Sequence, residues 1–302
     1  MASMQIRETD PERDVDALVA LMRESEPHVL TNIPAWLHRD RSVPARARLR
    51  AFVAEVDGAV VGESYALLRP WLEGDLGLIH VAVSGSARGQ GIGSALYDAA
   101  LVHADQIGLT ELAAMFFETP EGMAFATMRG FRPARADQLS AVDPRTIAEV
   151  PAAEVQPASS VDPRVLHELA EAAMHDVPGL APHRPSTFDE WSMQMLARPL
   201  YQPEGSFVAY ADDGPAAMSL LTADFESGRA VNNFTGTSPQ FRGRGLALAA
   251  KVATLRWSAA NGITTVSTVN DEENAPMLAI NRRLGYKPAG RRVEYVCELR
   301  QP

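Results

Sequence analysis

The chain has 302 residues, of which 46% are hydrophobic and 22% charged, as is typical of a globular protein with one large or two ordinary domains. Its formal net charge of -10 argues against a nucleic-acid partner, because such a binder needs a basic surface to neutralise phosphates. No apolar run reaches the roughly 18 residues of a membrane span, and the first ten residues do not resemble a secretory signal. Cys297 is the single cysteine, so we expect a cytoplasmic protein without a disulfide, a metal site or a membrane partner.

The first half predicts mostly strands with a few helices between them. A short strand at 5–8 precedes a helix at 14–23, where apolar residues recur at helical spacing. Strands at 50–56 and 59–68 flank an Asp57-Gly58 turn and form a hairpin. A strand at 76–83 follows, and then a helix at 92–106 that begins at a glycine-rich loop. A strand at 111–117, a short helix that ends near 129 and a final strand from 131 complete this half.

The second half predicts the same succession of elements. A helix at 165–175, a hairpin at 206–225 and a strand at 230–235 come first. A helix at 246–261, which begins at a second glycine-rich loop, a strand at 264–268 and a helix at 275–284 follow. This order of mostly antiparallel strands and few helices predicts an α+β domain that is used twice.

Short sequence matches support a repeat. Pairs of segments match in the same order at an offset of 154 or 155 positions: 51–58 with 206–214, 88–93 with 242–247, 108–110 with 262–264, and 130–133 with 285–288. We interpret them as two copies of one domain, at 1–147 and 148–302, joined where several prolines interrupt regular structure.

Each copy has a glycine-rich loop, led by an arginine, between a strand and a helix. The loops consist of Arg88, Gly89, Gln90, Gly91, Ile92, Gly93 and Ser94, and of Arg242, Gly243, Arg244, Gly245, Leu246 and Ala247. The first turn of a helix has unpaired N–H groups and a partial positive charge, and glycine lets a phosphate approach the backbone closely. Neither loop has the lysine of a P-loop or the glycine spacing of a dinucleotide fingerprint, so we expect another pyrophosphate ligand.

The pattern Arg-x-x-Gly-x-Gly/Ala after a strand resembles the acyl-CoA loop of the GNAT superfamily of N-acetyltransferases. The second copy is also similar to the family's late signature, at Asn270, Asn274, Met277, Asn281, Leu284, Gly285 and Tyr286. The resemblance implies two tandem folds, each a mixed, mostly antiparallel sheet flanked by helices. It further implies that the cofactor's pantetheine arm lies between two splayed strands. The cofactor contacts that it implies, besides the two loops, are Val81, Val83, Thr235, Thr237, Asn270 and Asn274.

The resemblance implies an N-acyltransferase that uses acetyl-CoA or another acyl-CoA and acts on a small-molecule or peptide amine, as a monomer or homodimer. Direct attack by the amine requires a stabilised oxyanion and a protonated leaving thiolate. The family's tyrosine acid corresponds to Ala126 in the first copy and to Asn281 in the second. Thr119 replaces the family asparagine that the second copy keeps as Asn274. We therefore expect transfer in the second copy, with Asn281 at the thioester end of the cofactor.

Candidates for a general base are less specific. Asp224 and Glu226 lie close to the strand before the second loop, and His175 and Asp176 end a helix that borders the acceptor site in similar enzymes. For each of them a solvated surface group is the alternative interpretation. His80 lies on a predicted strand, where a structural histidine is the expected role.

Two alternatives stay open at this point. Because neither copy keeps the tyrosine, the chain is also compatible with a non-catalytic acyl-CoA-binding sensor or scaffold. Tandem members of the superfamily include an enzyme that acetylates a cysteinyl pseudodisaccharide to finish mycothiol. This chain is similar to it in layout, although its late signature differs, so a mycothiol-type amine is one acceptor class. Variable loops at 26–44 and 178–203 are expected to form the acceptor pocket.

Overall fold

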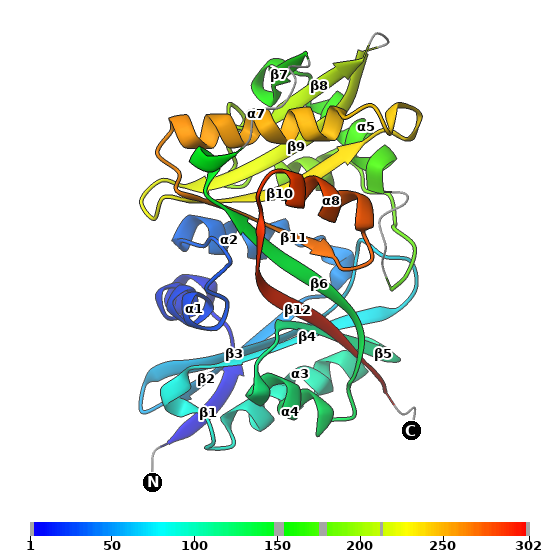
Figure 1. Ribbon diagram of the computed structural model, residues 1–302. Helices are drawn as coiled ribbons and strands as arrows, with labels where there is room; N and C mark the ends of the chain where they lie inside the picture. Colours follow the sequence, from blue (N-terminus) through cyan, green and yellow to red (C-terminus); the bar gives the residue numbers. More distant parts are fainter. Residues whose placement is uncertain (1–2, 148–153, 175–179, 212–213, 300–302) are drawn as a thin grey trace. The chain divides into compact units, whose positions relative to one another are not determined.

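The computed structural model describes residues 3–147, 154–174, 180–211 and 214–299. It divides into two compact units, Met1–Arg135 with Arg292–Pro302 (unit 1) and Ala136–Arg291 (unit 2) (Figure 1). The expected junction of the sequence copies borders the range 148–153, and His175 and Asp176 also lie outside the described residues. No helix in these described ranges is long and apolar enough to cross a membrane.

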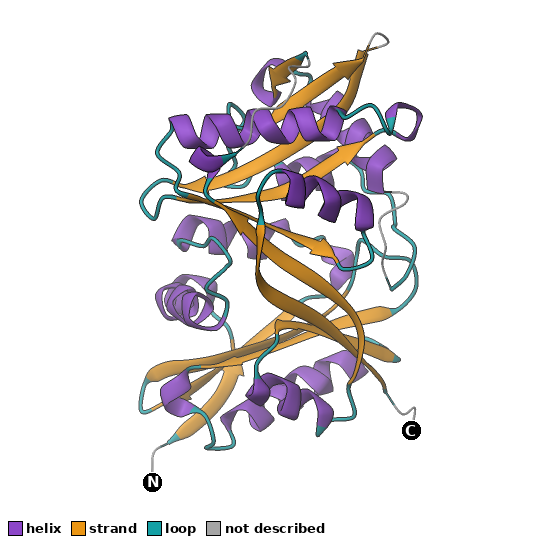
Figure 2. Ribbon diagram, in the orientation of Figure 1, coloured by secondary structure: helices purple, strands orange, loops and turns teal. Residues whose placement is uncertain are grey.

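Unit 1 is built on one sheet with the strand order β1-β2-β3-β4-β5-β12. Its strands are β1 (Met4–Glu8), β2 (Arg50–Val56), β3 (Ala59–Leu68), β4 (Leu76–Val83), β5 (Glu111–Phe117) and the later part of β12 (Lys287–Glu298). Its helices are α1 (Pro11–Ser25), α2 (Ile33–Ser42), α3 (Ile92–Gln106) and α4 (Pro120–Thr127). Consecutive side chains of β2 point to opposite faces, so Val53 packs with α1 and Ala54 with α3. Helices therefore cover both faces of the sheet (Figure 2).

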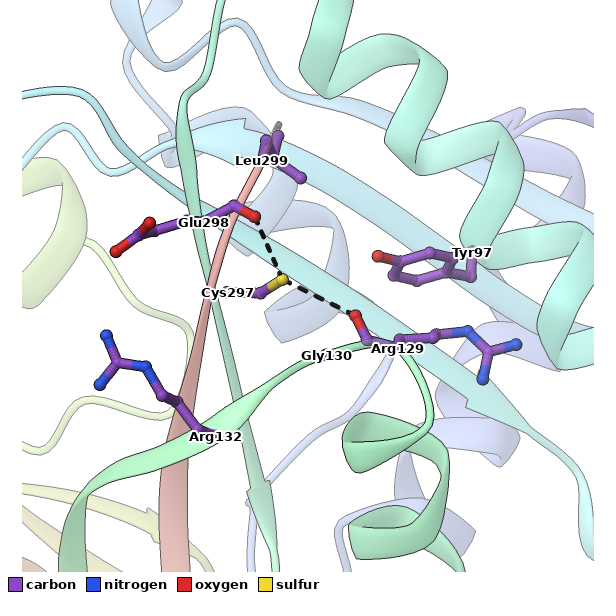
Figure 3. A pocket seen from close by; sticks show the side chains of 7 residues that line it. All are labelled: Tyr97, Arg129, Gly130, Arg132, Cys297, Glu298 and Leu299. Atoms are coloured by element: carbon purple, nitrogen blue, oxygen red, sulfur yellow. Dashed lines mark hydrogen bonds between the residues drawn. The ribbon is translucent and has the colours of Figure 1, made fainter. Parts of the chain in front are cut away.

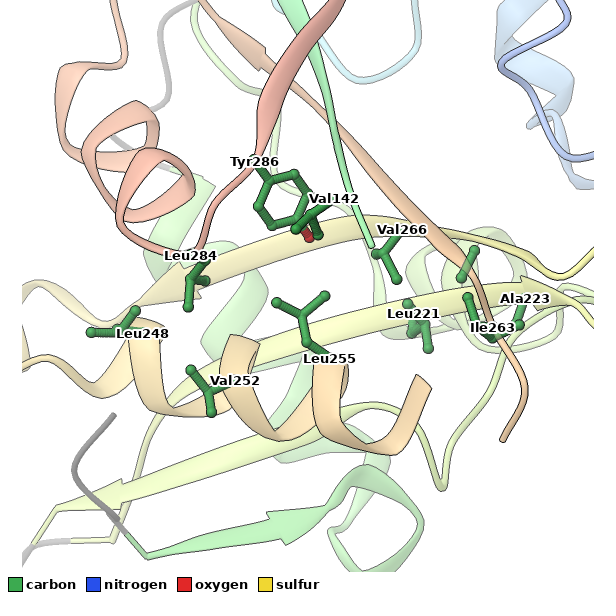
Figure 4. Packing of buried hydrophobic residues seen from close by; sticks show 11 residues of the cluster. Val142, Leu221, Ala223, Leu248, Val252, Leu255, Ile263, Val266, Leu284 and Tyr286 are labelled. Atoms are coloured by element: carbon green, nitrogen blue, oxygen red, sulfur yellow. The ribbon is translucent and has the colours of Figure 1, made fainter. Parts of the chain in front are cut away.

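Unit 2 repeats this plan with the strand order β6-β11-β10-β9-β8-β7. Its strands are β7 (Val155–Pro157), β8 (Phe207–Ala211), β9 (Gly214–Asp224), β10 (Arg229–Thr237), β11 (Thr265–Asp271) and most of β6 (Arg132–Val142). Its helices are α5 (Pro163–Met174), α6 (Phe188–Met195), α7 (Leu246–Ala260) and α8 (Ala275–Arg283). Leu248, Val252 and Leu255 of α7 pack against Leu221 and Val266 of the sheet (Figure 4). On the opposite face, α5 packs against β9 and β10.

The predicted α+β class and the predicted strands and helices are confirmed, whereas α2, α6, β7 and β12 were not predicted. The first two fall in ranges that the sequence analysis treated as variable loops. Each has a helix-start signal: the Asn32 side chain accepts from Ala35 N, and Thr187 and Glu190 form a capping box. Because α2 and α6 each bury mainly one tryptophan, Trp36 or Trp191, they lack a long apolar period.

The sheets of the two units exchange their last strands. Residues Arg292–Glu298 of β12 pair with β5, and residues Asp137–Val142 of β6 pair with β11. Each compact unit thus contains an edge of its sheet that comes from the other sequence copy. A buried ion pair between Arg69 and Glu294, 6% and 3% exposed, fixes β12 within unit 1.

Replacement of Glu294 by glutamine should destabilise unit 1 by roughly 3 kcal/mol, because it leaves the Arg69 guanidinium buried without a counter-charge. Hydrogen exchange of the β5 amides, read by mass spectrometry, should then be about a hundredfold faster. The control is Glu272→Gln, which breaks the exposed pair between Glu272 and Arg291 and should cost at most about 1 kcal/mol. Equal exchange in both variants would contradict a structural role for the exchanged strand.

Candidate cofactor and acyl-transfer site

In each unit, two parallel strands pair only at their beginnings. β4 pairs with β5 from Leu76 to Leu78, and β10 pairs with β11 from Arg229 to Val231. All four strands continue past these points, so each sheet opens into a gap beside its central strand. Val81 and Val83 lie on β4, and Thr235 and Thr237 lie on β10, all beyond the last paired residue. These are the strand positions that the sequence analysis expected to hold a pantetheine arm.

The two glycine loops lead into α3 and α7 with the same backbone. Gly91 and Gly245 are the N-cap residues, with φ of 82° and 78°, and neither helix start has a side-chain cap. Gly89 and Gly243 also have positive φ, at 76° and 77°. A Cβ at any of these glycines would meet no protein atom within 4 Å, so a ligand can reach the first-turn N–H groups from solvent. Both loops therefore have the exposed, uncapped helix start that an anion site of the expected kind requires.

Side chains distinguish the two loops. In unit 1, Arg88 Nε donates to the Val83 carbonyl at 3.0 Å, and Gln90 Nε2 donates to the Ser86 carbonyl at 3.4 Å. Arg129 of the α4 end donates to Ser94 Oγ at 2.7 Å. In unit 2, Arg242 and Arg244 are exposed, as Arg88 and Gln90 are in unit 1, and the Arg244 guanidinium lies 5.5 Å from the centre of the Phe241 ring. The buried loop residues are Ile92 in unit 1 and Leu246 and Ala247 in unit 2, which anchor the helix starts, and Gly93 lies under the ring of Phe125.

A β-bulge marks the central strand of unit 2. Asn232 lies opposite Leu221 and Phe234 opposite Leu220, so Asn233 is the extra residue. Asn232 is 3% exposed, and its side chain braces the bulge by donating to Ser219 Oγ at 2.8 Å and accepting from Thr235 Oγ1 at 2.7 Å. By contrast, β4 pairs with β3 without a register shift from Gly77 to Val83. The sequence analysis missed this role, which a polar residue in a buried strand could have signalled.

A chain of polar side chains lies beside the gap of unit 2. Lys251 Nζ of α7 donates to Asn281 Oδ1 of α8 at 2.7 Å, and Asn281 Nδ2 donates to Asn270 Oδ1 of β11 at 2.7 Å. Lys251 is 0% and Asn281 1% exposed, whereas Asn270 is partly exposed. The ammonium group also lies 4.8 Å from the centre of the Tyr286 ring. Burial lowers the pKa of Lys251 to about 7.

The structure thus brings Asn270 and Asn281 together and adds Lys251, which the sequence analysis missed. The available signal was a lysine within the apolar first half of the helix at 246–260. Asn274 is the N-cap of α8, where its Oδ1 accepts from Met277 N at 3.2 Å. This bond is a helix-capping role.

Asp224 and Glu226 lie elsewhere in unit 2. They belong to the turn between β9 and β10, next to Arg229, where β10 is still paired with β11. Asp224 closes that turn by accepting from Glu226 N at 3.2 Å and from Ser227 Oγ at 2.7 Å. The gap opens only after Val231, so the two carboxylates lie at the paired end of the strand.

The matching positions of unit 1 carry no such polar chain. At the repeat offset, Lys251, Asn281 and Asn270 correspond to Tyr97, Ala126 and Phe116. The Tyr97 ring packs edge-on against Phe125, with ring centres 6.3 Å apart. Beside it lies a cavity of about 620 Å³, lined by Tyr97, Arg129, Gly130, Arg132, Cys297, Glu298 and Leu299 (Figure 3). Burial raises the pKa values of both Tyr97 and the Cys297 thiol, which suits packing more than proton transfer.

Comparisons with known proteins agree with this geometry. Residues 15–131 match the model of the acetyltransferase (GNAT) family. The fold is similar to a tandem GNAT protein from the clavulanic acid biosynthesis pathway, with a TM-score of 0.76 and 20% identity over 99% of this chain and 100% of that one. It is also similar to a GCN5-related N-acetyltransferase from Sphaerobacter thermophilus, with a TM-score of 0.72 and 20% identity over 99% and 96% of the two chains.

A relative by sequence is the mycothiol acetyltransferase of Rothia mucilaginosa (strain DY-18). It is 26% identical over 264 residues, which cover 77% of this chain and 70% of the relative. The opened sheets and the glycine-led helix starts define a fold of the acyl-CoA N-acyltransferase class. The chain is thus similar to tandem GNAT N-acetyltransferases and has two such folds in one polypeptide. Enzymes of this family take the acyl group from an acyl-CoA and act on amine acceptors.

Replacement of Gly245 by alanine should weaken CoA binding at unit 2 about tenfold, because a methyl group at the N-cap obstructs the approach to the helix N–H groups. Gly262→Ala is a matched control, since Gly262 also has a positive φ (79°) and no atom within 4 Å of a Cβ, but lies at the other end of α7. Both variants should lose about 1–2 kcal/mol of stability. Isothermal titration with CoA tests the difference, and equal affinities in the two variants would contradict the anion site.

Replacement of Lys251 by methionine should change how stability depends on pH. The pKa of Lys251 is about 7 when folded and 10.5 ordinarily, so between these values the unfolded chain holds the extra proton. The unfolding free energy of the wild type therefore rises with pH in this window. Below the window Lys251 is protonated in the folded chain as well, so the full cost of burying its charge lowers the stability. The unfolding free energy of the variant minus that of the wild type should fall by up to about 1.4 kcal/mol per pH unit from about pH 7 to about pH 10. Urea unfolding at several pH values measures this, and parallel curves would contradict a lowered pKa of Lys251.

Proposed function

We propose that unit 2 transfers an acetyl group from acetyl-CoA to an amine by direct attack, and that unit 1 keeps a cofactor-type loop without transfer. The observation that supports this assignment is the hydrogen-bonded chain of Lys251, Asn281 and Asn270 beside the gap of unit 2. Unit 1 has Tyr97, Ala126 and Phe116 at the matching positions, and the side chains of these three residues form no hydrogen-bonded chain. The proposal is for a cytoplasmic enzyme that acts as a monomer or homodimer.

The residues of unit 2 fit acetyl-CoA in three places. The uncapped start of α7, with Arg242 and the loop up to Ala247, suits the pyrophosphate, since donors and positive charge meet there. The unpaired stretch of β10, with Thr235 and Thr237, suits the amide groups of the pantetheine arm. Asn270 and Asn281 would then lie near the thioester. When bound, the cofactor supplies an acyl group on a good leaving thiolate.

The chain's own contribution is to orient and to stabilise charge. The gap in the sheet would hold acetyl-CoA between β10 and β11. Because the thioester is then fixed in position, the direction from which the amine nitrogen attacks it is also fixed. Amide N–H groups near the leaving sulfur stabilise the negative charge that develops on it. The proposal assigns no catalytic role to Asp224 or Glu226, because both lie in the turn at the paired end of β10, which the Asp224 carboxylate closes. Water takes the proton of the amine.

The acceptor in this proposal is a small-molecule amine. The likeness to a mycothiol acetyltransferase favours an amine of the mycothiol type as the first compound to test. A peptide amine is the second class. The acceptor side is expected to include α5 and α6, which flank the sheet face opposite α7. Helix α6 lies within the predicted pocket range 178–203, and α5 is the helix that was expected to border the acceptor site.

Replacement of Arg242 by alanine should raise the KM for acetyl-CoA about tenfold or more, since a charge-assisted contact to phosphate contributes roughly 1.5–3 kcal/mol. Arg88→Ala is the matched control in unit 1 and should leave turnover within about twofold of the wild type. Thiol release from acetyl-CoA with a panel of amines, the mycothiol-type amine included, measures both. The reverse result would move catalysis to unit 1. Tight CoA binding without turnover on any amine would favour a sensor or scaffold.

A further inference from the structure

Lys251 is an unusual residue for its position in the fold. It is 0% exposed and lies on α7 among Leu248, Val252 and Leu255, which form part of the apolar core. Its partners among the described residues are uncharged: the Asn281 amide and the Tyr286 ring. Burying an ammonium without a carboxylate costs free energy, and the matching position of unit 1 folds with Tyr97 instead. The helix therefore does not require a lysine here, which points to a role in the neighbouring gap.

A protonated lysine fixes the orientation of both asparagine amides. An ammonium group only donates hydrogen bonds, so the atom of Asn281 that meets Lys251 Nζ at 2.7 Å is the carbonyl oxygen Oδ1. The Nδ2 group of Asn281 then faces Asn270 and can only donate, so the atom it meets at 2.7 Å is Asn270 Oδ1. As a result, Asn270 is left with its Nδ2 group as a free donor. Within the described ranges of the chain, no acceptor contacts that group.

The position of Asn270 makes this donor relevant to the gap. Asn270 lies on β11 three residues beyond Ser267, the last residue that pairs with β10. It is partly exposed, unlike the other two members of the chain. The hydrogen bonds thus run from the apolar core, through α8, to a strand that borders the gap. Each bond also polarises the next, since charge-assisted and linked hydrogen bonds strengthen one another.

We propose that Lys251 is a positioning residue for acyl transfer in unit 2: it orients Asn281, and through it Asn270, so that Asn270 Nδ2–H donates to the leaving sulfur. This inference rests on the proposed function of unit 2. In the transfer, the amine nitrogen forms a bond to the carbonyl carbon and the carbon–sulfur bond breaks with its electron pair on sulfur. The amine proton goes to water, and water protonates the thiolate after it is released. Asn270 keeps its proton throughout and stabilises the thiolate by hydrogen bonding.

The test compares the wild-type chain with Lys251→Met, which keeps the length of the side chain but removes the donor. We expect kcat to fall about tenfold while the KM for acetyl-CoA changes less than twofold, because the interaction strengthens only as charge develops on sulfur. A second readout is the ionisation of bound CoA, followed by the ultraviolet absorbance of its thiolate. Its acid dissociation constant should be about tenfold smaller in Lys251→Met than in the wild type. This readout needs no acceptor and does not depend on turnover.

Two further variants complete the experiment. Asn270→Ala removes the donor at a partly exposed site and should reproduce both effects, without adding to those of Lys251→Met when the two are combined. Tyr97→Phe, at the matching position of unit 1, should change neither readout. If the wild type turns over and Lys251→Met matches it in kcat and in thiol ionisation, this inference is overturned and the proposed function stands. If no amine is acetylated but the ionisation shift appears, the proposed function fails and the positioning role of Lys251 is retained.

Discussion

The structure depends on one constraint, which is that the parallel strand pair at the centre of each sheet is short. β4 and β5, and likewise β10 and β11, pair over three residues and then separate. Backbone N–H and C=O groups that a continuous sheet would satisfy internally remain available beyond that point. The helix that follows β4 or β10 begins at a glycine with positive φ, so its N–H groups are also left uncapped. The same opening thus supplies backbone donors and acceptors along a gap and an anion site at its end.

The two units use this common backbone with different side chains. Unit 2 adds a bulge braced by Asn232 and a buried polar chain that starts at Lys251. Unit 1 fills the matching space with the rings of Tyr97, Phe125 and Phe131. Buried polar groups lower stability unless every partner is in place, and aromatic packing does not carry that cost. A division of roles, in which unit 2 carries the chemistry and unit 1 supports the structure, is physically consistent with this difference.

Exchange of the last strands gives the tandem arrangement a structural reason. Unit 1 takes Arg292–Glu298 from the end of the chain, and unit 2 takes Ala136–Val142 from the end of the first copy. Each sheet therefore gains a paired edge, which a single copy would leave open or would have to cover in another way. The Arg69–Glu294 pair shows how specific the arrangement is, because a buried carboxylate near the chain end meets an arginine 225 positions away. A cut at the repeat boundary would remove one strand from each sheet.

The amino-acid sequence by itself determined the α+β class, the repeat, the two glycine loops and most of the helices and strands. These features depend on local periodicity and on residue types that act through their own backbone, such as Gly91 and Gly245 at the helix starts. Only the tertiary structure decided which partners meet. The exchange of β6 and β12 involves residues far apart in the chain. A strand pattern in either sequence copy does not reveal which of the two sheets that strand joins. The hydrogen bonds from Lys251 to Asn281 and Asn270 likewise join α7, α8 and β11. The spacing of residues within one helix cannot show that Lys251 is paired with an amide, because this pairing depends on how α7 and α8 pack together.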